Sequence, residues 1–137
     1  MLALLGMVGA IVAPAIPSLR RQAAADEVSR VTSDLQGLLA QARLTALERA
    51  TTVQLVLDPV NSRVWVFSVG HDEVRLLAES TLVRSPNVVL EANALRVRFA
   101  FDASGTASGG TVLVRDSRQT RQITVDPWSG ASHDDAR

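Results

Sequence analysis

Two histidines in the 137-residue chain are each followed by an aspartate, at His71-Asp72 and His133-Asp134. A histidine beside a carboxylate is the pairing found in general bases and in metal sites. Adjacent residues on a turn rarely orient one another in that way, and two histidines without any cysteine make a poor ligand set for zinc. We therefore interpret both histidines as exposed turn residues.

Carboxylate and hydroxyl groups are the next candidates for chemistry. Residues 102–106 and the pair Asp134-Asp135 supply oxygen ligands, but neither has the graded spacing of a calcium loop. A turn explains the first segment and a solvated tail the second. The chain has no Gly-x-Ser-x-Gly motif and no lysine, and residues 108–110 read as a flexible loop. The sequence therefore predicts a protein that is not an enzyme and has no cofactor or metal site.

Arginines give residues 96–121 a local positive charge, although the whole chain balances 14 acidic with 14 basic residues. If strands bring them together, these side chains would contact phosphates. Aromatic stacking partners are few, so we favour a solvated face and expect nucleic acid to be an unlikely partner. The five residues are Arg96, Arg98, Arg115, Arg118 and Arg121.

The elements that carry these residues begin with an uncharged, apolar stretch at residues 1–19. A cleaved signal peptide would start with basic residues, and a core helix of this length is unusual, so a membrane anchor is the favoured interpretation. We expect residues 1–22 to form a membrane and assembly helix, in which the glycines permit close approach. Its expected packing residues are Leu4, Leu5, Gly6, Val8, Gly9, Ile11, Val12 and Pro14.

The orientation of this anchor depends on its flanking charges. Arg20 and Arg21 follow the apolar stretch, and the positive-inside rule would then place the body of the protein in the cytoplasm. A basic leader upstream of Met1 would reverse that expectation.

Residues 23–137 are expected to form one domain. Apolar residues recur every three or four positions across 23–50, which predicts an amphipathic helix. Seven short strands follow, at 51–57, 63–69, 73–82, 86–91, 95–101, 111–115 and 122–125. The tail from residue 129 is polar and expected to be frayed. The predicted fold class is α+β, a long N-terminal helix packed on an antiparallel sheet or small β-sandwich.

Several stretches resemble the type IV pilin superfamily, and specifically the GspH/FimT class of minor pseudopilins. Residues 2–17 are similar to the anchor helix with its proline, and residues 38–49 followed by 52–55 resemble the end of the helix leading into the first strand. Residues 101–105, 112–114 and 123–130 are similar to the closing strands. Thr45 departs from the acidic residue usual at its position, and the basic leader and Glu of the family are not found ahead of Met1.

The resemblance implies a pilin-like fold and a structural role in a type II secretion system. Such a subunit would be held in the bacterial inner membrane by a single pass, with its C-terminal domain in the periplasm, and would join the fibre at or near its tip. The implied partners are other minor pseudopilins, the major pseudopilin and a prepilin peptidase, with methylation of the processed chain. Related major pseudopilins bind calcium.

Two other functions remain open from the sequence. One is a FimT/FimU-like minor type IV pilin for pilus assembly or DNA uptake, although those relatives often carry a C-terminal disulfide and this chain has no cysteine. The other is a periplasmic enzyme or small-ligand module, which a deep polar pocket around His71 or His133 would favour.

Overall fold

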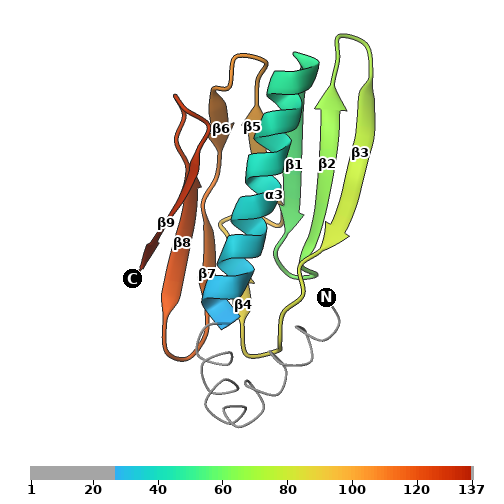
Figure 1. Cartoon of the computed structure of the whole chain (residues 1–137). Coiled ribbons are helices and arrows are strands. Elements are labelled where there is room, and N and C mark those ends of the chain that lie inside the picture. Colours follow the sequence, from blue (N-terminus) through green and yellow to red (C-terminus); the bar gives the residue numbers. More distant parts are fainter. Residues whose placement is uncertain (1–26, 137) are drawn as a thin grey trace, which may run out of the picture.

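A computed structural model of the chain describes residues 27–136, which form one helix and nine strands (Figure 1). The helix, α3, spans Glu27–Arg49. The strands are β1 (Thr52–Asp58), β2 (Arg63–Val69), β3 (Val74–Thr81), β4 (Val89–Glu91), β5 (Val97–Phe101), β6 (Ala107–Gly109), β7 (Val112–Arg115), β8 (Thr120–Val125) and β9 (Ser132–Ala136).

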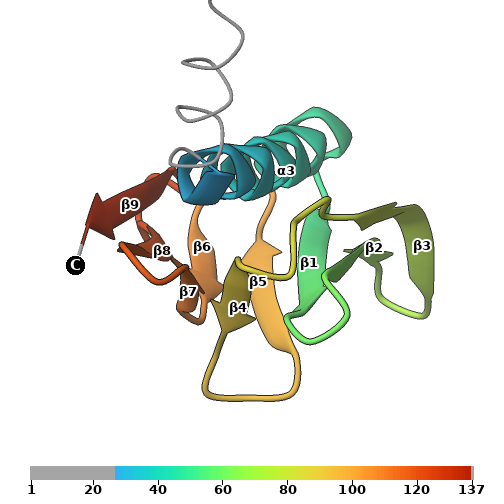
Figure 2. The same ribbon diagram turned by 90° about the horizontal axis from the view of Figure 1, so that it is seen from below.

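The strands make two antiparallel sheets. Five strands form one sheet in the order β3-β2-β1-β5-β6, and four form the other in the order β4-β7-β8-β9. Figure 2 shows α3 lying across one face of both sheets, which curve beneath it. The predicted α+β class, with a helix packed on antiparallel sheets, is confirmed.

The buried side of α3 carries the apolar residues at the predicted helical spacing. Val28, Val31, Leu35, Leu39 and Ala46 are each fully buried, because side chains three or four positions apart share a helix face. Strand alternation supplies the other side of the core, since successive side chains point to opposite faces of a sheet. The main strand contributors to the core are Val53, Leu55, Leu57, Phe99, Phe101, Val112, Val114 and Ile123.

The helix ends close to the predicted position, and the residue that follows it has a left-handed backbone conformation. Ala50 has a φ of 49°, and the Thr51 amide donates to the Ala46 carbonyl at 3.1 Å. This is the bond pattern of a helix C-terminus that usually contains glycine at the left-handed position. Because the chain reverses there at once, α3 leads directly into β1.

Two strands were not predicted. Residues 108–110 were expected to be a flexible loop, but β6 pairs with β5 and places Gly109 opposite Phe99. A Cβ on Gly109 would lie 2.6 Å from Phe99 Cδ1, so the absent side chain is what permits the pairing. The expected frayed tail is also wrong over β9, which pairs with residues 121–125 of β8.

Within residues 27–136 no helix is both long enough and apolar enough to cross a membrane. The predicted anchor and its packing residues, from Leu4 to Pro14, lie outside the described residues.

Candidate functional site

The two histidines do not meet. His71 is exposed in the turn between β2 and β3, where the Gly70 amide donates to the Glu73 carbonyl at 2.9 Å. His133 is also exposed, but it lies on β9 rather than on a turn, and its Nε2 is 2.7 Å from Thr124 Oγ1 across the strand pair. In the part of the chain that the structure describes, no group of three or more His, Asp or Glu side chains is placed to hold a metal ion.

The carboxylate of Asp102 forms its hydrogen bonds within its own turn. Its oxygens accept hydrogen bonds from the Ser104 amide at 2.8 Å, the Ser104 hydroxyl at 2.6 Å and the Thr106 hydroxyl at 2.5 Å. These bonds, led by that of the Ser104 hydroxyl, lower the pKa of Asp102 to about 2. The segment therefore forms a closed turn, as the sequence predicted.

Asp134 belongs to an internal network rather than to a solvated tail. Arg121 Nη1 donates to one Asp134 oxygen at 2.7 Å, and Gln36 Nε2 donates to the other at 3.3 Å. These contacts join β8, β9 and α3 on the core side of the smaller sheet. The tail interpretation of Asp134 is therefore wrong, and the ion pair helps to explain why β9 is ordered against β8.

The five arginines of residues 96–121 are divided between the two sheets. Arg121 pairs with Asp134, and Arg115 pairs with Glu91 on β4. Arg118 is exposed at the turn between β7 and β8. Arg96 and Arg98 belong to the other sheet, beside and within β5. The strands do not gather the five side chains into one positive patch.

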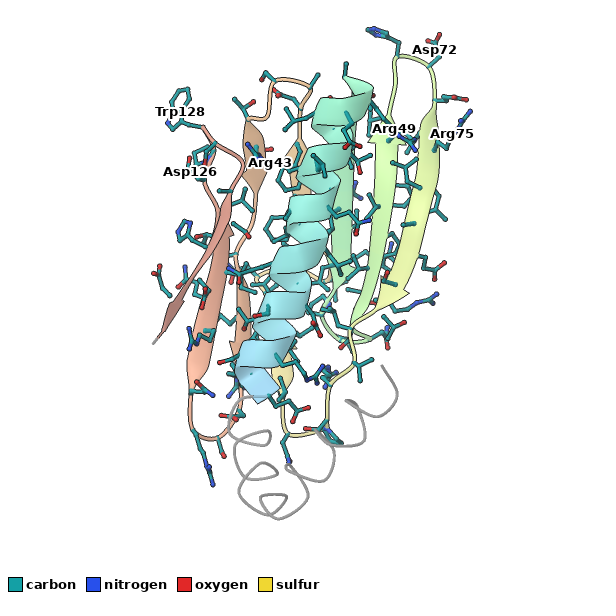
Figure 3. The ribbon with its side chains drawn as sticks, viewed as in Figure 1. Arg43, Arg49, Asp72, Arg75, Asp126 and Trp128 are labelled. Atoms are coloured by element: carbon teal, nitrogen blue, oxygen red, sulfur yellow. The ribbon has the colours of Figure 1, made fainter. Side chains whose placement is uncertain are left out.

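Arg43 is the side chain that joins the far end of α3 to both sheets. It packs against Gly105, which precedes β6, and Gly130, which precedes β9, and Figure 3 shows it reaching toward the turn that carries Asp126 and Trp128. Both glycines have positive φ, 92° and 70°. We call Arg43, Gly105 and Gly130 the Arg43 clasp. Its three residues lie in the stretches that resemble the pilin class, but the sequence alone did not indicate that they meet.

The other end of α3 is fixed to the connection between β3 and β4. The Glu27 carboxylate accepts hydrogen bonds from the Ser85 amide at 2.7 Å and the Ser85 hydroxyl at 2.8 Å, and these bonds lower the pKa of Glu27. Arg30 Nη2 donates to the Val83 carbonyl at 2.9 Å. The connection between β3 and β4 is therefore attached to the N-terminal end of α3.

Arg84 links three segments below the sheets and was not singled out in the sequence. Its guanidinium donates to the Val88 carbonyl at 2.8 Å, to the Val60 carbonyl at 3.2 Å and to the Ser62 hydroxyl. Ser62 is buried in a left-handed conformation, with a φ of 57°. Arg84 thus serves as a structural crosslink between these segments.

The outer face of the larger sheet, turned away from α3, carries aromatic and cationic side chains. We call the group Gln54, Val56, Trp65, Phe67, Arg96 and Arg98 the Trp65 face; it lines a hollow of about 430 Å³. The guanidinium carbons of Arg96 and Arg63 lie 5.0 and 5.4 Å from the Trp65 ring centroid, within cation–π range. A surface of aromatic and cationic side chains of this kind is suited to binding.

Comparison with solved structures identifies the class of fold. The type IV minor pilin FimU of Pseudomonas aeruginosa PAO1, in its P21 crystal form, matches with a TM-score of 0.65 and 12% identity over 81% of this chain and 90% of that one. The P65 form matches with a TM-score of 0.60 and 11% identity over 78% of this chain and 91% of that one. The fold is therefore that of a type IV pilin.

The family follows from the sequence itself. The family model described as Type II transport protein GspH matches residues 31–130, and the chain belongs to the GspH family. None of the curated proteins matches the chain. Family and fold together support a pilin-like structural role, as a minor pseudopilin or minor pilin that assembles with related subunits, and confirm the predicted GspH/FimT class.

Proposed function

We propose that the protein is a minor pseudopilin, a structural subunit at or near the tip of the type II secretion pseudopilus that supports protein export across the outer membrane. The match of the GspH family to residues 31–130 carries the proposal, because it covers most of α3 and every strand except β9. The subunit would reside in the inner membrane by a single pass before assembly, with the described domain in the periplasm.

The mechanism is assembly rather than chemistry. The apolar segment at residues 1–19 would contact lipid first and neighbouring helices later, while Gly6 and Gly9 allow close approach. At the described start of α3, the bonds of Glu27 and Arg30 to the β3–β4 connection hold the domain in a fixed position on the helix. A movement of the anchor would therefore carry the domain with it. The expected partners are the other minor pseudopilins and the major pseudopilin.

A charge in the proposed anchor tests this function. Val8→Arg should cost roughly 2.5–3.5 kcal/mol of membrane insertion, about a hundredfold in the equilibrium. We expect the variant to leave the membrane fraction and to fail to support secretion. Val8→Leu and Ser33→Arg are the controls, since the first keeps the apolar segment and the second puts the same charge on an exposed position of α3. Normal membrane fractionation and secretion by Val8→Arg would show that the anchor hypothesis is wrong.

The fold match to FimU favours one alternative, a minor type IV pilin that acts in pilus assembly or DNA uptake. Titration of the protein with duplex DNA at two salt concentrations separates the two. Salt-sensitive binding that is lost in Arg118→Gln and Arg121→Gln would support the pilin alternative. We expect no such binding, because Arg121 is already paired with Asp134, and Arg118 lies at a turn of the smaller sheet whereas Arg98 lies on β5 of the larger one.

A further inference from the structure

The Trp65 face has an apolar floor although it lies on the outside of the sheet. Val56 is only 4% exposed, because its strand neighbours are Trp65 on β2 and Arg98 on β5. Phe67 is placed next to Gln54 by the same pairing. The apolar surface continues to the edge strand β3 through Val74 and Leu76, whose exposed fractions are 64% and 50%. Aromatic and aliphatic residues in such a surface are typical of the centre of protein interfaces.

The cations of this face are not neutralised within it. Arg63, at its border, forms an ion pair with Glu79. Arg96 and Arg98 have no carboxylate partner among residues 27–136. The nearby Asp58 has a lowered pKa chiefly because Asn61 donates to it, and the charge of Arg96 lowers it less than these hydrogen bonds do. Neither guanidinium group is therefore in an ion pair within that range, and the Arg96 group, which lies over the Trp65 ring, can still bind an anion.

The spacing of these groups suits carboxylates on a polypeptide. Arg96 and Arg98 are two residues apart on the same side of the β5 segment, roughly 6.6 Å along an extended chain. Guanidinium groups bind carboxylates through paired, charge-assisted hydrogen bonds. A segment with one or two acidic residues at one end and an apolar residue at the other would place its charges on β5 and its apolar side chain on Phe67 or Leu76.

We propose that the Trp65 face binds an acidic, partly apolar segment of a partner protein. Charge complementarity selects this occupant, because the face offers two unpaired cations beside an apolar surface. A nucleic acid strand would need a longer row of cations, and Glu79 borders the face with the opposite charge. The proposal goes beyond assembly through the anchor, since this face lies on the side of the domain away from α3.

A displayed peptide library tests the chemistry of the partner. The full chain, held in detergent micelles and immobilised, is used to select from random twelve-residue peptides on phage. We expect the selected peptides to combine Asp or Glu with an aromatic or aliphatic residue. In a Trp128→Phe background Trp65 is the one remaining tryptophan, so its fluorescence reports binding at the face. Selection of peptides without acidic residues, or no selection at all, would overturn the proposal.

Arginine variants then locate the site. Arg96→Gln and Arg98→Gln should each weaken the selected peptides about tenfold or more, because each removes a charge-assisted contact. Arg118→Gln, which removes an exposed arginine from the other sheet, should leave the affinity unchanged. Equal affinity for all three variants would overturn the proposal, as would tighter, Arg98-dependent binding of a single-stranded oligonucleotide. These variants leave residues 1–19 unchanged, and the membrane test changes only Val8. Failure of peptide binding and failure of membrane assembly can therefore be told apart.

Discussion

Replacing Gly130 by alanine should destabilise the region where α3, the larger sheet and the smaller sheet meet. A Cβ at this position would lie 2.4 Å from the Gly105 carbonyl oxygen and 2.9 Å from both Cδ and Nε of Arg43. The Gly105 oxygen belongs to the backbone of a tight turn, so it cannot withdraw as the end of a side chain would. The clash is accordingly relieved only by moving the β8–β9 turn.

The size of the effect follows from two contributions. Alanine at a φ of 70° costs roughly 1–2 kcal/mol relative to glycine. Forcing an additional methyl group into a packed site costs roughly 1–3 kcal/mol. We therefore expect Gly130→Ala to lose about 2–5 kcal/mol of unfolding free energy, a large share of the roughly 5–15 kcal/mol typical of a native domain.

The assay is urea denaturation of the full chain in mild detergent, with unfolding monitored by tryptophan fluorescence. Gly37→Ala is the matched control, because its Cβ would meet nothing within 4 Å on the exposed side of α3. That change should stabilise the protein by about 0.5–1 kcal/mol, since glycine is unfavourable inside a helix. A loss below 1 kcal/mol in Gly130→Ala, or a loss in Gly37→Ala as large as that in Gly130→Ala, would refute the reasoning.

Two further changes are expected to act on the turns. Ala50→Gly should raise the unfolding free energy by about 1 kcal/mol in the same assay, because Ala50 has a φ of 49° at the end of α3; a decrease would contradict this account of the helix end. Because the folded pKa of Asp102 is about 2, below its ordinary 3.8, the carboxylate stabilises the fold above pH 4 and loses that effect as the pH falls toward 2. Asp102→Asn should flatten the dependence of unfolding free energy on pH across that range, and an unchanged curve would argue against the Ser104 and Thr106 hydrogen bonds.

Much of the fold was predictable because its signals are local. The apolar spacing of Val28, Val31 and Leu35 requires only a helix with one buried side. The seven predicted strands combine β-branched residues with turn residues at their ends. The strand β6 carried no such signal, since Ala107, Ser108 and Gly109 have low strand preference. It can pair beside Phe99 only because Gly109 has no side chain. The same holds for β9, whose polar residues are ordered by pairing with β8.

The candidate surfaces were harder to predict, because they depend on register. Sequence spacing grouped Arg96 with Arg121. In the structure the two residues belong to different sheets, and Arg121 forms an ion pair with Asp134. Trp65 was not singled out, although the pairing of Val56 with both Trp65 and Arg98 makes it the centre of a surface. The pilin resemblance depended on stretches that include Arg43 and Gly130, and the structure shows that these residues touch in the Arg43 clasp.

The attachment of α3 at both ends has a mechanical consequence. Near the N-terminal end the helix is bonded to Ser85 and Val83, and near the C-terminal end it is held by Gly105 and Gly130. A pulling force applied along α3 is therefore shared between contacts some 15 residues apart, roughly 22 Å along the helix. Contacts loaded together in shear must break together, whereas contacts at one end would peel in sequence. When α3 is pulled, we therefore expect the domain to move with the helix as one rigid body, and not to unfold away from it.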